Sequence, residues 1–318
     1  MTAAPAAPAA RALTYSPRMI FEQHDVKGRN QRMKRHLLRT ADRLSAVIAL
    51  LMAGAAGAGL FAHAIYRDNL LVVSSWRGND MITLCAAVPI LLVSVFLSAR
   101  GSQRARLVLL GMLDYALYNY AFYLFGAAFN ALFLVYAALF ALSIFALIFG
   151  LAGLDVEGLI ERFRERTPAR WISVYMIVVA LLLGGFWIAV ALQYVFGGLI
   201  PTMVSDTGHP TNVTGALDIS LVVSVNLLGG FWLWKRHPWG YAVAAIANVK
   251  GAAYMLALSV ATWSAVRAGP SDGAGQIVLW GVIGAGCLAA AVALLANLRS
   301  GSNRAERPTQ GRSECRPG

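Results

Sequence analysis

The chain has 318 residues, of which 58% are hydrophobic and only 13% are charged. Soluble domains carry about 25% charged residues, so this composition excludes an ordinary soluble domain, and repeated apolar runs of about 20 residues indicate membrane-spanning helices. The net charge of +12 does not predict nucleic-acid binding, because the Lys and Arg residues gather between the apolar runs, as they do in membrane proteins.

The N-terminal residues 1–43 form a basic segment that contains nine Lys and Arg residues. The apolar run that follows, from Ala46 to Tyr66, is longer than the core of a signal peptide, which has about 7–15 residues. We therefore expect this run to stay in the protein as its first span, with the basic segment in the cytoplasm.

Eight apolar runs have the length of about 20 residues that a helix needs to cross the hydrocarbon layer. They predict an all-α fold, a polytopic transmembrane bundle with spans at 44–66, 81–99, 106–128, 131–153, 171–197, 215–234, 238–264 and 276–297. The transmembrane domain is expected to cover residues 44–297, in two halves, 44–153 and 171–297. Residues 154–170 are predicted to form an amphipathic linker, and residues 298–318 a disordered cytoplasmic tail.

The distribution of basic residues predicts the orientation of this bundle. If the N-terminus is cytoplasmic, 23 of the 27 Lys and Arg residues fall in cytoplasmic segments, in agreement with the positive-inside rule. We therefore expect a multi-pass protein of the cell membrane, the inner membrane in a bacterium, with both termini in the cytoplasm. Its basic segments would then face the anionic headgroups of the lipid bilayer.

The two halves share a pattern that suggests an internal duplication. In each half the second span follows an Asp, Asp80 or Asp218, and ends at a short basic turn, while the third span is the most polar of its half. Four spans in each unit predict a 4+4 parallel repeat. The alternative is that any two membrane hairpins look alike at this level.

Ionisable residues in the apolar runs are the main candidates for a site, because an Asp or Lys at the centre of a membrane helix costs about 2.5–3.5 kcal/mol. Three such residues are Asp114, Asp218 and Lys250, and Lys250 is the only Lys or Arg well inside a run. At about 1.5 Å per residue, Lys250 lies between the depths of the two carboxylates, so either can be its partner. Helical spacing adds further polar residues to the substrate or ion-pair candidates: Tyr118, Asn119, Asn226 and Tyr254.

No motif for a cofactor, a metal or a catalytic site is found in the sequence. It lacks a Gly-rich phosphate loop, a His-Glu-x-x-His motif and a Gly-x-Ser-x-Gly motif, and its three cysteines and five histidines show no metal-ligand spacing. We therefore predict no cofactor, no metal and no catalytic residues. An enzyme is the least favoured of the functions considered.

Residues 113–140 and 233–254, which include LDYALYNY and ANVKGAAY, resemble stretches of uncharacterised multi-pass membrane proteins from bacteria. The resemblance implies no activity and no site residues. The leading hypothesis is a small-solute or proton-coupled transporter that uses the intramembrane Asp, Lys and Tyr residues. The alternative is a structural or regulatory membrane component with an architectural ion pair. A small-molecule ligand is expected but not identified, and an oligomer is compatible with the sequence.

Overall fold

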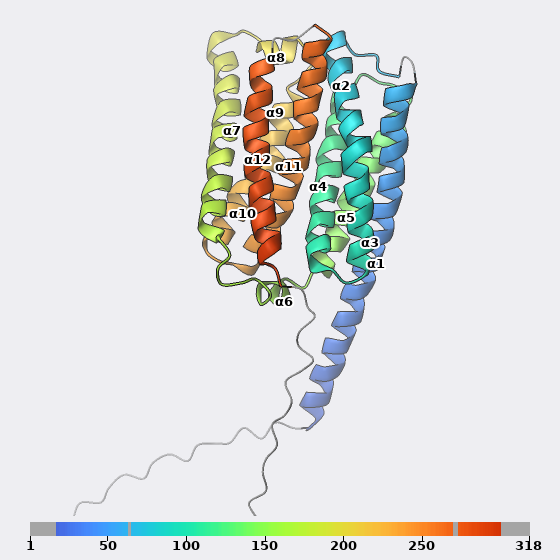
Figure 1. The fold of residues 1–318 in the computed structure, drawn as a ribbon, viewed down its shortest axis with the longest axis vertical. Helices are drawn as coiled ribbons and strands as arrows, with labels where there is room; N and C mark the ends of the chain where they lie inside the picture. The colour runs from blue at the N-terminus through green and yellow to red at the C-terminus, as the bar shows by residue number, and fades with distance from the viewer. Residues whose placement is uncertain (1–16, 63–64, 270–272, 300–318) are drawn as a thin grey trace, which may run out of the picture.

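Apolar runs separated by short polar turns fold the chain into an antiparallel bundle of helices (Figure 1). The computed structural model describes residues 17–62, 65–269 and 273–299, without the side chains of 17–27 and 274. In this part of the chain eight helices are long and apolar enough to cross a membrane, and no strand is present. The predicted all-α polytopic bundle is confirmed, and the chain is a multi-pass membrane protein. The expected tail lies outside the described residues from 300 onward.

The first four spans are formed by α1 (Pro17–Phe61), by α2 (Leu70–Ile82) with the π-helical segment η1 (Thr83–Ala87) and α3 (Val88–Ala99), by α4 (Gln103–Gly126), and by α5 (Phe133–Gly153). A short helix, α6 (Val156–Ile160), leads to the second half. The last four spans are formed by α7 (Ala169–Gly197), by α9 (Val213–Leu217) with η2 (Asp218–Val223) and α10 (Ser224–Trp234), by α11 (Pro238–Arg267), and by α12 (Ala274–Asn297). The helix α8 (Thr202–Ser205) lies in the loop between α7 and α9.

The second span begins at Leu70 and not at residue 81, as the sequence predicted. Asn69 caps this earlier start, because its side chain accepts a hydrogen bond from a backbone amide of the first turn at 3.0 Å. The added turns include the polar run from Ser74 to Asp80, part of which is buried, and hydropathy alone therefore does not reveal them as part of a span. Asp80 thus lies inside a membrane-spanning helix and not at its entrance.

A π-helical segment interrupts the second span of each half. These segments begin at Thr83 and Asp218, and each starts twenty residues before the next long helix, α4 or α11. The turn before that helix contains a residue with positive φ in each half, Gly101 at 88° and Arg236 at 55°. π-helical turns are rare and occur frequently at functional sites. Their matching positions therefore make the second span of each half a candidate for part of a functional site.

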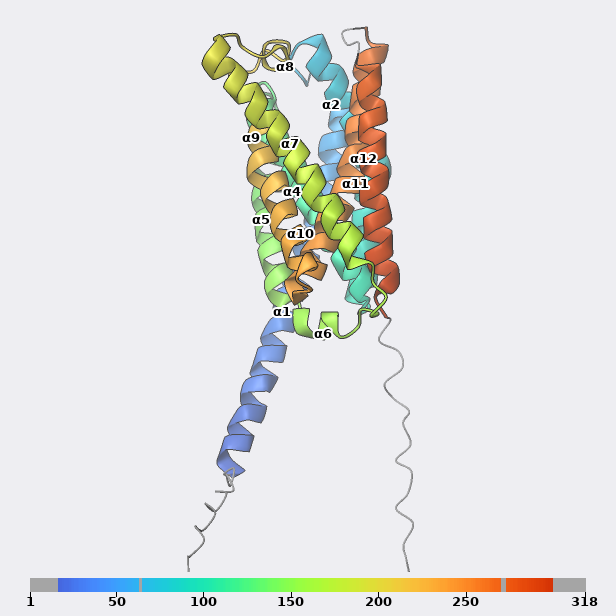
Figure 2. The same ribbon diagram turned by 90° about the vertical axis from the view of Figure 1, so that its left-hand side faces the viewer.

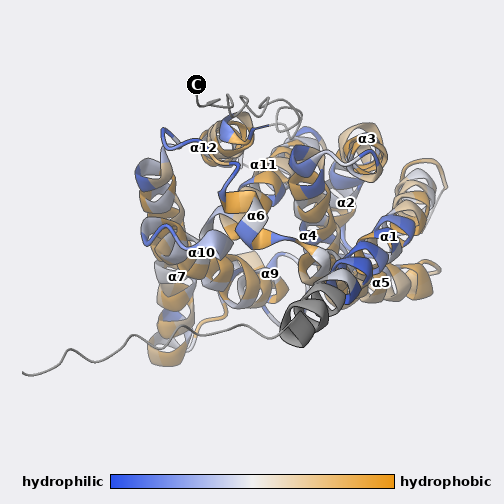
Figure 3. Ribbon diagram, turned by 90° about the horizontal axis from the view of Figure 1, so that it is seen from below, coloured by the Kyte–Doolittle hydropathy of each residue, from blue (hydrophilic) through white to orange (hydrophobic). Residues whose placement is uncertain are grey.

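The centre of the bundle is formed by α4 and α11, which pack against each other. α4 also packs against α3 and α5, and α11 packs against α2, α10 and α12. The two central helices approach closely at Gly111, where a larger residue would overlap the Val249 side chain. Large apolar side chains such as Leu134, Leu182 and Val278 are exposed on the outside of the bundle, and Figure 3 shows that much of the helix ribbon has the orange colour of hydrophobic residues. The outer surface therefore suits lipid, and polar groups gather inside.

The first span begins and the last span ends on one side of the bundle, which we call the terminal end. α1 continues beyond the bundle there as a long helix (Figure 2). Asp42 of α1 pairs with Arg106 of α4, with Oδ1 and Nη1 2.5 Å apart. The linker 154–170 is helical over α6 and in its last two residues, which begin α7, and it packs against α11, with the Phe163 and Tyr241 rings 4.8 Å apart. The apolar side of the expected amphipathic linker therefore meets protein and not a membrane surface.

Candidate functional site

Lys250 lies near the middle of α11, with only 7% of its surface exposed. Pro238 starts this helix, and His237 caps it by accepting a hydrogen bond from the Trp239 amide at 3.3 Å. The Lys250 Nζ atom lies 3.9 Å from the centre of the Tyr118 ring and 5.4 Å from that of Tyr254, which is a cation–π arrangement. The ion pairs of the described residues do not include Lys250.

Asp218, the first residue of η2, accepts two hydrogen bonds from other helices. The Tyr118 hydroxyl donates to its Oδ1 atom at 2.6 Å, and the Trp187 indole donates to its Oδ2 atom at 2.9 Å. Tyr118 thus contacts both charges, since its ring faces Lys250 while its hydroxyl binds Asp218. A direct ion pair between Asp218 and Lys250, which the depth estimate allowed, is not formed.

Asp114 is the second carboxylate near Lys250 and lies on α4, one turn before Tyr118. Lys250 interacts electrostatically with both Asp114 and Asp218 without forming an ion pair in contact with either. Within the described residues, the Asp114 carboxylate takes part in no hydrogen bond. We use the name Lys250 layer for the group formed by Asp114, Tyr118, Asp218, Lys250 and Tyr254.

A second polar cluster surrounds Asp80 of α2, which is 3% exposed. Its carboxylate accepts hydrogen bonds from the Tyr66 hydroxyl and, at 2.8 Å, from the Tyr123 hydroxyl. Tyr66 lies in the loop before α2, where burial and the nearby Asp80 charge raise the pKa of its phenol. Gly59 of α1 leaves space for this contact, because a side chain there would overlap both partners.

Hydrogen bonds extend from this cluster toward the centre of the bundle. The Asn79 Nδ2 atom donates to the Tyr123 hydroxyl at 3.1 Å and to Asn119 Oδ1 at 2.8 Å. This direction follows because the Tyr123 hydroxyl donates its single proton to Asp80 and can then only accept from Asn79. The Asn119 Nδ2 group is then left without a partner among the described residues, although Asn119 is only 1% exposed. A buried donor without a partner is costly and marks a place for a water or a ligand.

A cavity of ≈ 140 Å³ lies beside Asn119, between α2, α4 and α11. Its walls join the two clusters, since Asn79 and Asn119 belong to the first, and Tyr254 belongs to the Lys250 layer. The other lining residues are Ser75, Trp76, Phe122, Leu258, Ala261 and Thr262. A single water needs about 10–15 Å³ in this measure, so the cavity has room for several waters or one small solute.

Most of the predicted site residues lie in one layer or in the adjoining cavity wall: Asp114, Tyr118, Asn119, Asp218, Lys250 and Tyr254. The Asn226 side chain instead donates to the Val222 carbonyl of its own span at 2.8 Å. Sequence reasoning did not include Asp80, because the predicted second span began after it. The signal that could have found it was the i, i+4 spacing of Ser75 and Asn79, which continues a polar helical face back from Asp80.

No family model, no curated protein and no solved structure matches the chain. The chemistry of the site is therefore inferred from its own geometry. It keeps charged groups inside a membrane-spanning bundle, connects them through tyrosine and asparagine side chains, and leaves a small cavity beside them, whose mostly apolar wall carries the Asn79 and Asn119 amides. Such a site can bind a small polar ligand or exchange protons.

Proposed function

We propose that this membrane protein is a transporter that moves a small solute together with a proton or another small cation. The Lys250 layer and the adjoining cavity would form its binding site. The observation that supports this proposal most is the imbalance of charge in the Lys250 layer and at Asp80. Three carboxylates, Asp80, Asp114 and Asp218, stand there against the single ammonium of Lys250, and none of these four side chains lines the cavity itself.

The imbalance matters because each uncompensated Asp in a membrane helix costs about 2.5–3.5 kcal/mol. Lys250 can balance one of the three carboxylates, so the other two need protons or a bound cation. Protons bind and leave according to the pH of the side from which the site is reached. The charge of the interior then depends on that side, and this dependence is what couples a proton gradient to the movement of a solute.

A structural or regulatory membrane component is the second candidate function. Its support is the pair of hydrogen bonds to Asp218, by which Tyr118 of α4 and Trp187 of α7 connect three elements of the bundle. In that case the polar groups would only fix helix packing. However, an architectural charge pair normally brings nitrogen and oxygen into contact, and the tyrosine ring between Lys250 and Asp218 favours the transporter.

We propose, in addition, that the terminal end faces the cytoplasm. The support is the same charge distribution, with 23 of the 27 Lys and Arg residues in segments on that side. Arg32, Arg35 and Arg39 of α1 are exposed at the terminal end, and they are placed to meet anionic headgroups of the bilayer.

We also propose that the two halves are a 4+4 parallel duplication. The support is the common register of the π-helical segments and of the turns that follow them. In this register Thr83 corresponds to Asp218, and Tyr115 corresponds to Lys250. The Thr83 and Tyr115 hydroxyls lie 3.0 Å apart, so the first half holds a neutral hydrogen-bonded pair where the second half holds two charged groups.

Proton binding by the interior carboxylates can be tested without knowing the solute. Proteoliposomes adsorbed on a solid-supported membrane are exposed to a step in external pH, and the transient displacement of charge is recorded. We expect a displacement in the wild type that is clearly reduced in Asp218→Asn and absent when Asp80 and Asp114 are also changed to Asn. The matched control is Asp155→Asn, an exposed carboxylate that pairs with Lys34 at 3.3 Å and should leave the signal unchanged.

A displacement no larger than that of protein-free liposomes would rule out proton coupling. The same conclusion would follow if the triple variant gave the wild-type signal. Either result would leave the structural role as the better account of the Lys250 layer.

A further inference from the structure

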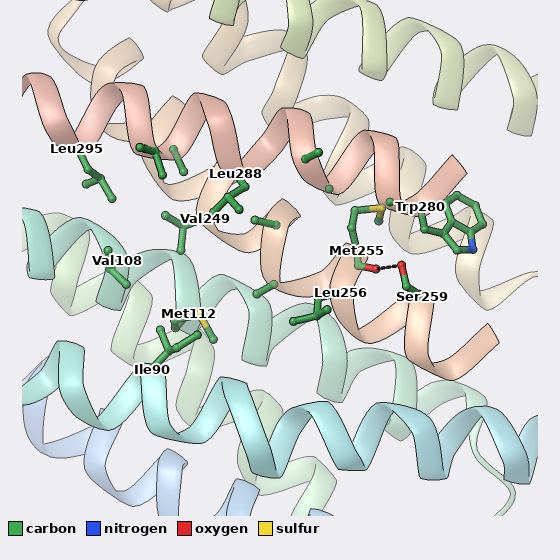
Figure 4. A pocket seen from close by; sticks show the side chains of 17 residues that line it. Ile90, Val108, Met112, Val249, Met255, Leu256, Ser259, Trp280, Leu288 and Leu295 are labelled. Atoms are coloured by element: carbon green, nitrogen blue, oxygen red, sulfur yellow. Dashed lines mark hydrogen bonds between the residues drawn. The ribbon is translucent and has the colours of Figure 1, made fainter. Parts of the chain in front are cut away.

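A long groove runs along the side of the bundle where the first and second halves meet (Figure 4). It has a volume of ≈ 450 Å³ and lies between α3 and α4 on one side and α11 and α12 on the other. Ile90 and Val108 line the first side, and Leu256, Leu288 and Leu295 line the second. The groove is separate from the cavity beside Asn119, with which it shares no lining residue.

The lining of the groove is almost entirely apolar. Of its 17 residues only Ser259 and Trp280 carry a side-chain nitrogen or oxygen. The Ser259 hydroxyl is already used, since it donates to the Met255 carbonyl at 2.7 Å, the dashed line in Figure 4. Such a surface offers almost nothing to a polar solute, and it suits a hydrocarbon.

The groove opens sideways into the lipid. Ile90, Leu256, Leu288 and Val292 line it and are at the same time exposed on the outside of the bundle. Its apolar wall is therefore continuous with the lipid-facing surface. Along α12 it extends from Trp280 to Leu295, which is about 22 Å at 1.5 Å per residue. The hydrocarbon layer is about 30 Å thick, so the groove has the direction and length of an extended acyl chain.

A positive charge stands at one end of this groove. Leu295 lies in the last turn of α12, at the terminal end of the bundle. Arg104, one helical turn before Val108 on the same face of α4, is exposed at that end. Its guanidinium donates to the Leu298 carbonyl from Nε at 3.0 Å and from Nη2 at 2.5 Å. This contact holds the group in place and leaves further N–H donors for an anion.

We propose that the groove is a binding site for one anionic phospholipid, with an acyl chain along α11 and α12 and the phosphate group at Arg104. The apolar wall recognises the chain, and the guanidinium recognises the phosphate, to which arginine can donate two parallel hydrogen bonds. Because the site lies at the seam of the two halves, the lipid contacts both of them. The proposal does not depend on transport.

The test uses the full-length protein in vesicles of phosphatidylcholine that contain a small fraction of phosphatidylglycerol with a photoreactive diazirine in its acyl chain. After illumination, cross-linked peptides are identified by mass spectrometry. We expect labels on α4, α11 and α12 at the groove. In Ala285→Phe the ring fills the groove from an exposed position, and labelling should fall roughly tenfold, which corresponds to about 1.4 kcal/mol. The matched control is Ala189→Phe, which is exposed on α7 away from the groove.

The headgroup is tested at Arg104. We expect Arg104→Gln to remove the preference for phosphatidylglycerol over a phosphatidylcholine probe with the same acyl chain, and Arg104→Lys to retain most of it. Equal labelling by the two probes in the wild type would overturn the anionic lipid, and labelling that Ala285→Phe leaves unchanged would overturn the groove. Only protein that elutes as a single folded species is compared. Ala285→Phe tests the acyl-chain part of the site and the Arg104 substitutions test the headgroup part, so each experiment can refute the proposal by itself.

Discussion

Replacing Lys250 by Met removes the ammonium of the Lys250 layer and keeps a side chain of similar length. One part of the loss is the contact with the Tyr118 ring, where Nζ lies 3.9 Å from the centre, and a desolvated cation–π contact contributes about 2 kcal/mol. The other part is the charge balance of Asp114 and Asp218. Breaking a buried pair in contact costs about 3–5 kcal/mol. Since these groups are not in contact, we expect the free energy of unfolding to fall by about 2–4 kcal/mol.

The measurement is the free energy of unfolding in mixed micelles, with dodecyl sulfate titrated into a non-ionic detergent and helix content followed by circular dichroism. Asp218→Asn and the double variant complete a thermodynamic cycle. If Lys250 balances Asp218, the double variant should recover about 1–2 kcal/mol relative to Lys250→Met. Tyr118→Phe keeps the ring under Lys250 but loses the 2.6 Å hydrogen bond to Asp218, so it should lose about 1.5–3 kcal/mol, the range for a bond to a charged group.

The reasoning would be refuted if Lys250→Met were as stable as the wild type within about 0.5 kcal/mol, the usual effect of a neutral surface substitution. Lys250 would then balance no carboxylate, and the charge argument behind proton coupling would be lost. The layer would have a purely structural role if the variant with both Lys250→Met and Asp218→Asn regained the full free energy of unfolding of the wild type. In that case the charge displacement after a pH step should also be the same in this variant as in the wild type.

Two further predictions concern the Asp80 cluster and the cavity. Gly59→Ala should lower the free energy of unfolding by about 1–3 kcal/mol through overpacking against Asp80, whereas Gly57→Ala, which meets no atom within 4 Å, should be neutral or slightly stabilising; equal effects at both positions would contradict the packing argument. Asn119→Cys, in a background without the native cysteines, should react with a membrane-impermeant thiol reagent more readily than Asn226→Cys, and protection of Asn119→Cys from both sides of the membrane would mean that the cavity is closed to water.

The number and order of the spans follow from hydropathy because most of the helices have an outer face that meets lipid and is apolar, and the buried span α4 is still apolar enough to be recognised. The second span shows where this fails. In α2, which begins at Leu70, Asn79 and Asp80 are buried inside the protein. Their polarity therefore marks the side of the helix that faces the bundle interior and does not mark the end of the span. Hydropathy averages over all faces of a helix, and a helix with a polar inner face therefore looks shorter than it is.

The sequence predicts the depth in the membrane at which the site residues lie, but not which side chains contact one another. Counting residues placed Lys250 and Asp218 at compatible depths, and the structure has them on either side of Tyr118. Depth along a helix is fixed by its rise, whereas the identity of a neighbour depends on helix rotation and on the π-helical turn at Asp218, which a regular periodicity cannot anticipate. Asn226 shares the predicted face of Asp218, yet it bonds to its own backbone.

The matching register of η1 and η2 allows each position in one half of the protein to be compared with the corresponding position in the other half. Thr83 and Tyr115 form a neutral contact at the place where the other half has Asp218 and Lys250. In the proposed duplication these two pairs of positions correspond to each other, so the same substitution can be made at the charged pair and at the neutral pair. One chain thus contains a charged pair of residues in one half and a neutral pair at the corresponding positions of the other half. Each pair can serve as the control for the other.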